Sequence, residues 1–214
     1  MAKKETTLLQ LILSLTVISV VAGVVLAAVF SKTQQPIEAD RIKKKNDAIM
    51  NVLPNFDISK GKIERRTYLP EGEKDSVVLY LAYSGNQLFG AAVESYTNMA
   101  YSGTFSIIVG FDSEGTILKT EVLQANETPG LGDKIDASKD SKFAPQFVGK
   151  NPATFALKVT KDGGDVDAIT ASTITSRAFC DALERAYAAF RVEILGDAAA
   201  WDGVTGATSN QHKN

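Results

Sequence analysis

The chain opens with a long stretch of uncharged and mostly apolar residues. No charged residue occurs from Thr6 to Ser31, and almost every position between Leu11 and Phe30 is apolar. As a helix this stretch would be about 39 Å long at about 1.5 Å per residue, which exceeds the roughly 30 Å hydrocarbon core of a bilayer. The apolar region of a cleaved signal peptide is shorter, about 7–15 residues. The pattern therefore predicts a retained transmembrane anchor, with its N-terminal tail, over residues 1–31.

Residues 32–54 follow as a predicted helical stalk. Pro36 is suited to the first turn of a helix, and we expect the helix to run to about Val52, because the residue before Pro54 disfavours helical geometry. The basic cluster at residues 41–45 is more typical of a solvated helix face than of a lipid-binding patch.

The next part of the chain, residues 55–195, predicts a domain rich in strands. Six short segments carry the branched and aromatic residues typical of strands, and turn sequences separate them. They are residues 77–82, 88–93, 104–111, 116–123, 155–160 and 166–169. Short connections of this kind predict antiparallel pairing.

The apolar pattern changes to helical spacing after Thr175 and keeps that spacing to Phe190. A helix is therefore expected to cover one face of the sheet. The predicted fold class is α+β, an N-terminal transmembrane helix followed by a domain with an antiparallel sheet and packed helices. Residues 196–214 are predicted to be a flexible C-terminal tail.

Composition narrows the chemistry. The 214 residues are 44% hydrophobic and 22% charged, with a net charge of -2, which excludes a strongly basic nucleic-acid binder and an acidic disordered tail. The chain has one cysteine, Cys180, and one histidine, His212. A Cys₄ or multi-histidine metal site is therefore impossible. Cys180 lies beside the apolar stripe of the last helix and is interpreted as a packing residue.

Charge does not decide on which side of the membrane the domain lies. Lys3 and Lys4 precede the anchor, and Lys32 and the cluster at residues 41–45 follow it. This count leans away from an inside N-terminus, but a long domain is translocated largely regardless of its charges.

Two segments could carry chemistry, and the first is the loop from Asn126 to Asp133. Its sequence, Asn-Glu-Thr-Pro-Gly-Leu-Gly-Asp, makes tight turns. Glu127 and Thr128 offer an acceptor and a hydroxyl, and the backbone N–H groups of Gly130 and Gly132, which flank Leu131, could meet a polar ring or an anion.

The second segment is the predicted strand-to-helix junction at residues 166–177. Five hydroxyl residues crowd there, and an N-cap accounts for only one or two of them. They are Thr170, Ser172, Thr173, Thr175 and Ser176. A helix N-terminus favours a phosphate, and Arg177 would add positive charge in the first turn.

These two segments together resemble a known family. Glu127–Ile135 and Asp167–Arg177, in this order, are similar to the G subunit of the Rnf complex, the ion-translocating ferredoxin:NAD oxidoreductase of bacterial membranes, and more distantly to the C subunit of the Na⁺-translocating NADH:quinone reductase. The resemblance covers most of the chain. It implies that residues 55–195 form a domain that carries FMN, joined by its phosphate to a threonine hydroxyl as a phosphodiester. It also implies that a flavin transferase makes this bond from FAD, outside the cytoplasmic membrane.

The family's acceptor motif is Asp-x-x-Ser/Thr-Gly-Ala-Thr, with the last threonine modified. Asp167, Thr170 and Thr173 fall on its defined positions, so the resemblance implies Thr173 as the acceptor. Ala171 and Ser172 replace the glycine and alanine of the motif. Alanine enters the positive-φ region less easily than glycine, which bears on the efficiency of attachment.

The same motif occurs again in the C-terminal tail, without any departure. Residues 202–208 read Asp-Gly-Val-Thr-Gly-Ala-Thr, and only six residues follow. Thr208 is therefore a candidate second acceptor. The candidate cofactor-binding residues are Glu127, Thr128, Gly130, Leu131, Gly132, Thr170, Ser172, Thr173, Thr175, Ser176, Arg177 and Thr208.

The resemblance implies an electron-transfer protein that is not an enzyme by itself. Its expected partners are the other subunits of a membrane redox complex, the transferase and the membrane. It is expected in the cytoplasmic membrane as a single-pass protein, with the flavin domain on the outer or periplasmic side. The Glu127 loop is expected to border the flavin ring or the ribityl chain. The alternatives are a flavinylated carrier of another membrane redox system and a non-redox, membrane-anchored binding module.

Overall fold

The structure, a computed structural model, describes residues 7–70, 73, 75–136, 142–201 and 204. The chain divides into two compact units, residues 1–44 and 45–214. The second acceptor-like motif, except for Val204, lies outside the described residues, and so does Thr208.

A single helix, α1, runs from Leu8 to Val52. Its N-terminal part is apolar, exposed to solvent in the isolated chain, and long and apolar enough to cross a membrane. The helix ends at Val52, as the sequence predicts, but no new helix begins at Pro36, which lies inside α1. A proline inside a helix removes one backbone hydrogen bond, and the helix continues past it at the cost of that bond.

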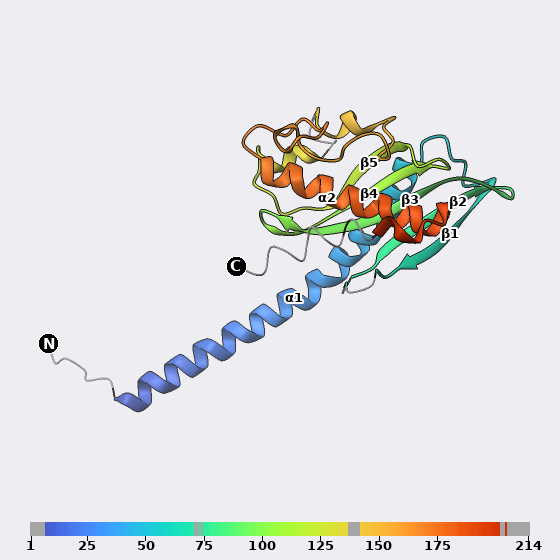
Figure 1. The fold of residues 1–214 in the computed structure, drawn as a ribbon. Helices are drawn as coiled ribbons and strands as arrows, with labels where there is room; N and C mark the ends of the chain where they lie inside the picture. Colours follow the sequence, from blue (N-terminus) through green and yellow to red (C-terminus); the bar gives the residue numbers. More distant parts are fainter. Residues whose placement is uncertain (1–6, 71–72, 74, 137–141, 202–203, 205–214) are drawn as a thin grey trace. The chain divides into compact units, whose positions relative to one another are not determined.

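The second unit is built on one five-stranded sheet in the order β1-β2-β3-β4-β5, with every neighbouring pair antiparallel. The strands are β1 (Gly61–Tyr68), β2 (Val77–Ser84), β3 (Gln87–Ala100), β4 (Gly103–Asp112) and β5 (Ile117–Gln124) (Figure 1). The last four coincide with predicted strands, and the predicted α+β class is confirmed.

The pattern of the sequence does not predict β1. This strand reads Gly-Lys-Ile-Glu-Arg-Arg-Thr-Tyr and lacks a clear apolar alternation. It lies at the edge of the sheet and, among the described strands, pairs only with β2, from Gly61 opposite Ser84 to Tyr68 opposite Val77. None of its side chains is fully buried, so little selects for apolar residues along it and its apolar pattern is weak.

The predicted strands at residues 155–160 and 166–169 are wrong. The two segments share one isolated bridge, Val159 opposite Val166, and it is parallel. A parallel ladder needs a crossover of about a dozen residues or more. Here a 3₁₀ turn, η4 (Thr160–Asp162), and Gly163 at φ 81° make the connection, so the pairing stops at one bridge.

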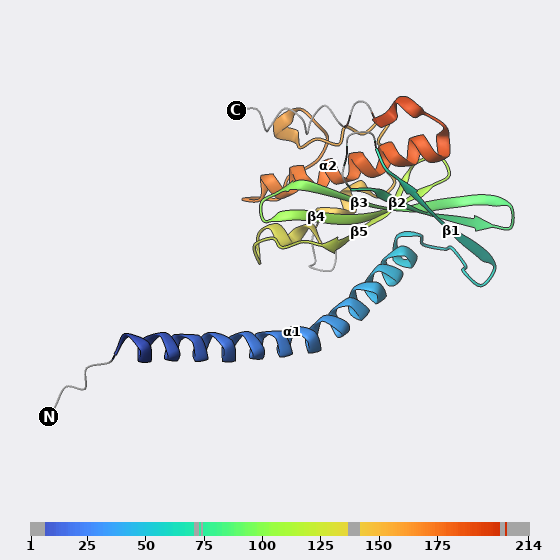
Figure 2. The same ribbon diagram turned by 90° about the horizontal axis from the view of Figure 1, so that it is seen from below.

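Helix α2 (Thr173–Phe190) covers one face of the sheet (Figures 1 and 2). Its predicted apolar stripe is buried against side chains from β2, β3 and β4. Phe105, Phe111 and Phe179 are among the largest side chains that are completely buried. Further helical turns in the described residues are η1 (Gly132–Ile135), η3 (Ala144–Phe147), the π-type η5 (Arg191–Leu195) and η6 (Ala198–Trp201).

The last turn of α1 packs on the opposite face of the same sheet. Ala48, Ile49, Val52 and Leu53 are buried there against side chains that alternate with those facing α2, such as Ile108. The end of α1 therefore contributes Ala48, Ile49 and Val52 to the domain core.

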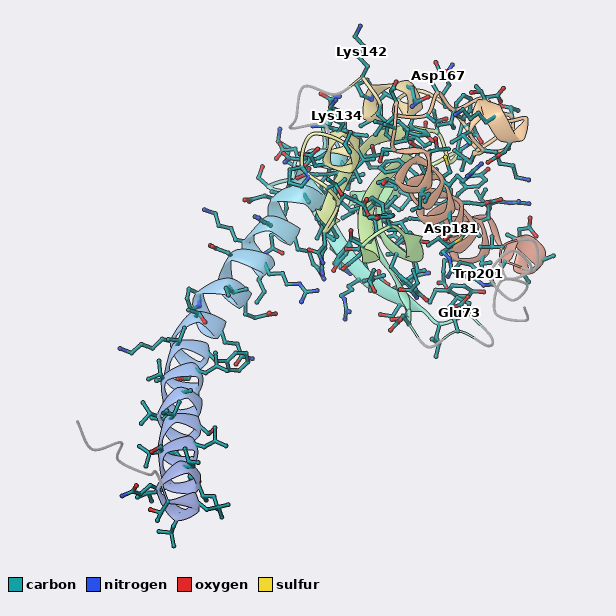
Figure 3. All side chains as sticks on the ribbon, turned by 90° about the vertical axis from the view of Figure 1, so that its left-hand side faces the viewer. Glu73, Lys134, Lys142, Asp167, Asp181 and Trp201 are labelled. Carbon is teal, nitrogen blue, oxygen red and sulfur yellow. The ribbon has the colours of Figure 1, made fainter. Side chains whose placement is uncertain are left out.

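A buried arginine, Arg185, forms ion pairs in the C-terminal half of α2. The Arg185 guanidinium lies 3.0 Å from Glu73 and 3.4 Å from Asp181, and it lies over the rings of Tyr96 and Trp201. Figure 3 shows Glu73, Asp181 and Trp201 on the same side of the domain. This cluster attaches the β1–β2 connection and η6 to α2.

Candidate cofactor site

A pocket of about 470 Å³ opens where three segments meet: the turn between β3 and β4, the loop at residues 126–133, and the junction that leads into α2. Its walls are Tyr101, Glu127, Thr128, Leu131, Gly132, Ala171, Ser172, Thr173, Ile174 and Thr175. Its volume lies within the usual range of small-molecule sites, about 300–1,000 Å³. The two segments singled out in the sequence therefore form one site. Lys134 and Asp167, labelled in Figure 3, mark the end of the domain at which these two segments lie.

The loop at residues 126–133 folds around the backbone carbonyl of Thr128. Leu131 N–H donates to this carbonyl at 3.1 Å, and Gly130 has φ 78°. Proline at the second position and a positive-φ glycine at the third are the pattern of a type II turn. Gly130 itself is exposed and does not line the pocket, whereas Gly132, the first residue of η1, does.

The junction is a tight turn held by the Ser176 hydroxyl of α2. Ser172 N–H donates to the Ile169 carbonyl at 3.0 Å, and the Ser176 hydroxyl donates to the Ser172 carbonyl and accepts from Ile169 N–H, both at 3.0 Å. Ala171 has φ 62°, in the left-handed region. At this position the acceptor motif has glycine, which adopts that conformation without strain.

The five clustered hydroxyls lie in three different environments. Ser172, Thr175 and Ser176 are buried and hydrogen-bonded within the protein. Thr170 is exposed and lies outside the pocket. Thr173 is half-buried in the pocket wall, and its hydroxyl makes no hydrogen bond with any residue that the structure describes. Of these five residues, Thr173 is thus the one that lines the pocket with a hydroxyl that makes no hydrogen bond within the described residues.

Backbone N–H groups at the start of α2 lie beside this hydroxyl. The N-cap residue, Ser172, makes no side-chain cap, because its hydroxyl donates to the Thr175 hydroxyl instead, at 2.8 Å. The N–H groups of residues 173–175 donate to no other described residue. Uncapped N–H groups at the N-terminus of an 18-residue helix favour an anion.

Glu127 joins the two segments directly. Its carboxylate accepts from the Thr175 hydroxyl at 2.7 Å and from Ser102 N–H at 3.4 Å. The carboxylate is thus engaged with the protein on both of its oxygens.

The structure does not bring Arg177 to the pocket. Its guanidinium forms a bidentate pair with Asp162, at 2.7 and 2.8 Å, and this hydrogen bond lowers the pKa of Asp162. Among the described residues that line the pocket, none carries a positive charge. An anion there would depend on the helix N-terminus and on hydroxyl groups.

Three wall residues were missed from the sequence: Tyr101, Ala171 and Ile174. Tyr101 is 70% exposed and Ile174 is 49% exposed, and with Leu131, 41% exposed, they give the pocket an apolar rim. The length of β3 is the signal that would have placed Tyr101, because this strand continues through the polar residues 94–98 to the turn that carries Tyr101.

Cys180 lies away from this site. It is buried, and burial raises the pKa of its thiol to about 12. The packing role expected for it agrees with this environment.

The class of protein follows from a comparison with known families. The family model of the FMN-binding domain matches residues 100–188. The matched region includes the β3–β4 turn, the Glu127 loop and the start of α2.

Comparison with curated proteins gives the particular family. The chain is 34% identical to the G subunit of the ion-translocating oxidoreductase complex of Salmonella typhi over 75% of this chain and 80% of that protein. It is 34% identical to the corresponding G subunit of Vibrio vulnificus over 71% of this chain and 74% of that protein. The match to the G subunit of Aliivibrio fischeri is 42% identical but covers 54% of this chain and only 56% of that protein. The chain belongs to the family of the G subunit of the ion-translocating oxidoreductase complex, the Rnf family, and its apolar N-terminal helix indicates a membrane-anchored protein.

Proposed function

We propose that this chain is an electron-transfer subunit of a membrane-bound ion-translocating ferredoxin:NAD oxidoreductase complex, and that it carries FMN bound covalently by a phosphodiester to Thr173. The observation that carries the proposal is the position of the Thr173 hydroxyl. It is the half-buried hydroxyl in the pocket wall that makes no hydrogen bond within the described residues, and it lies at the N-terminus of α2.

The pocket residues fit the parts of FMN. The N–H groups at the start of α2 suit a phosphate, and the apolar rim of Tyr101, Leu131 and Ile174 suits a flat aromatic ring. When bound, FMN supplies the redox chemistry, and the protein holds it in place and adjusts its environment. The chain is not an enzyme by itself, because its role is to pass electrons between partners.

Attachment is a group transfer to Thr173. The bond between the Thr173 oxygen and the flavin phosphate forms, the pyrophosphate bond of FAD breaks, AMP leaves, and the hydroxyl proton is released. A flavin transferase is the partner that catalyses this step.

A covalent bond also suits the electrostatics of the site. No cationic side chain is among the described residues lining the pocket, so a phosphate held there without a bond would lack an ion pair. A tether keeps a ligand at high effective concentration regardless of its concentration in solution.

The test is flavin fluorescence in a denaturing gel, because only covalently bound flavin survives denaturation. Protein made in cells that contain the transferase is expected to fluoresce, and Thr173→Val is expected to lose the signal of this site. Thr173→Ser keeps a hydroxyl and serves as the matched control. A Thr173→Val protein with undiminished covalent flavin, mapped by peptide mass spectrometry, would refute attachment at Thr173.

We also propose that Thr208 is a second acceptor, on the basis of its complete match to the motif at residues 202–208. Peptide mass spectrometry of protein made with the transferase is expected to show FMN on the peptide that contains Thr208, and Thr208→Val should remove it. Only unmodified peptide would end this proposal.

For localisation, we propose a single-pass protein of the cytoplasmic membrane with the flavin domain on the outer side, where the transferase acts. Protease added to the outside of spheroplasts is expected to digest the domain and leave cytoplasmic marker proteins intact.

Co-purification with other membrane subunits distinguishes the Rnf complex from a flavinylated carrier of another redox system. Absence of covalent flavin would favour the non-redox binding module.

A further inference from the structure

The Glu127 loop and the acceptor junction, far apart in the sequence, are linked by a short hydrogen bond. The Thr175 hydroxyl donates to Glu127 Oε2 at 2.7 Å, across a separation of 48 residues. A hydroxyl has one proton to give, so this bond fixes the direction in which the Thr175 oxygen can interact with other groups.

The chain of hydrogen bonds continues to the residue beside Thr173. The buried Ser172 hydroxyl donates to Thr175 Oγ1 at 2.8 Å. Ser172 lies between Ala171, at φ 62°, and Thr173. A carboxylate that accepts from Thr175 therefore leaves the Thr175 oxygen free to accept from Ser172, and the chain runs in one direction, from Ser172 through Thr175 to Glu127.

Close packing at Gly132 is an independent sign that this contact is specific. A Cβ at Gly132 would lie 2.6 Å from Glu127 Oε2 and 3.0 Å from Thr175 Oγ1. A side chain at this position would displace Glu127, so the glycine lets the loop backbone lie directly against the hydrogen bond between Glu127 and Thr175.

We propose that Glu127 is a positioning residue for flavin attachment. Through Thr175 and Ser172, its carboxylate holds the strained turn at Ala171 in the form that directs the Thr173 hydroxyl into the pocket. This proposal rests on the proposed attachment of FMN at Thr173. It gives Glu127 a role through the protein's own turn, which differs from bordering the flavin ring.

Two conservative variants separate reach from charge. Glu127→Gln keeps the length of the side chain and an oxygen that accepts from Thr175, but it loses the charge and the second oxygen, which accepts from Ser102 N–H at 3.4 Å. Glu127→Asp keeps the charge, but its carboxylate is one methylene too short to reach Thr175. The measurement is the initial rate of covalent FMN incorporation with purified transferase and FAD, followed by intact mass, on full-length protein in detergent.

We expect Glu127→Gln to retain most of the wild-type rate and Glu127→Asp to slow it roughly ten-fold, the scale of one lost hydrogen bond to a charged group. Thr175→Val is expected to slow attachment similarly, Thr175→Ser to restore it, and Glu127→Asp combined with Thr175→Val to be no slower than either alone. Thermal unfolding of each variant identifies any that fail to fold. If Glu127→Asp or Thr175→Val fails to fold, the rates of Glu127→Gln and Thr175→Ser test the positioning role.

The outcomes distinguish the two proposals. Wild-type protein without covalent FMN at Thr173 would overturn the proposed function. Normal attachment in the wild type together with a fast Asp variant and a slow Gln variant would show that charge matters rather than reach, and would overturn the positioning role. Equal rates in all variants would overturn it as well.

Discussion

Ala171 is the residue at which this chain departs most visibly from the acceptor motif, and its backbone shows the cost. It has φ 62°, in a region that costs a residue with a Cβ about 1–2 kcal/mol. The turn is held by several hydrogen bonds around Ser172, which oppose that strain.

Ala171→Gly is therefore expected to stabilise the domain by about 1 kcal/mol, after allowing for the greater freedom of glycine in the unfolded chain. Ala153→Gly is the matched control in an exposed loop, where φ is not positive, and it should lower stability instead. Chemical denaturation measures the change in the free energy of unfolding of each variant, which is expected to be positive for Ala171→Gly and negative for Ala153→Gly. A less stable Ala171→Gly protein would show that the turn is not strained.

Cys180 gives a second prediction at a single side chain. Burial raises the pKa of its thiol to about 12, so at pH 8 the reactive thiolate is on the order of one molecule in ten thousand. Iodoacetamide at pH 8 should leave the folded protein unmodified and label it completely in denaturant, as followed by intact mass. Rapid labelling of the folded protein would contradict the buried environment.

Strands and helices differ in how clearly the sequence marks them. Strands β2 and β4 and helix α2 were predictable because buried apolar side chains repeat along them. Strand β5 was predictable from its apolar residues, of which Ile117 is buried and Leu118, Val122 and Leu123 are partly buried. Strand β1 has no such repeat, because none of its side chains is fully buried. The apolar segments at residues 155–160 and 166–169 contribute Val159 and Val166 to the core without forming a ladder, and composition alone does not distinguish these two outcomes.

The same distinction applies to the site. The loop and the junction were found because their residues are chemically unusual, and the structure brings them to one pocket. Which hydroxyls face the pocket could not be derived from spacing, because the contacts of Thr175 with Glu127 and of Arg177 with Asp162 are formed only in the folded chain.

The contact between α1 and the sheet can be tested at Gly110. A Cβ there would lie 1.8 Å from the backbone carbonyl oxygen of Val52, closer than any real contact. Gly110→Ala should therefore destabilise the domain by about 2 kcal/mol or more, because it pushes the last turn of α1 away from β4. Trimming the side chain with Val52→Ala should not rescue it, since the clash is with the main chain. Thermal unfolding in detergent measures both, and full rescue would contradict this geometry.

For the chain as a whole, the boundary between anchor and domain is the feature that sequence and structure place differently. The sequence suggests a stalk at residues 32–54 and a domain that begins at residue 55. In the structure, the compact unit begins at Lys45, and Ala48, Ile49, Val52 and Leu53 are buried in a core cluster on one face of the sheet. The end of α1 thus connects the anchor to the domain and also forms part of the domain's hydrophobic core.

Two N-terminal truncations distinguish these boundaries. A chain that begins at Lys45 keeps every residue of that core cluster and should unfold cooperatively. A chain that begins at Asn55 loses four buried apolar residues, of which Ile49, Val52 and Leu53 each contribute about 1.5–3 kcal/mol by burial. Because a domain is stable by only about 5–15 kcal/mol in total, this loss should leave the shorter chain largely unfolded or prone to aggregation. Circular dichroism and thermal unfolding compare the two. Equal stability would mean that the last turn of α1 is a connection only, and that the domain does begin after Pro54.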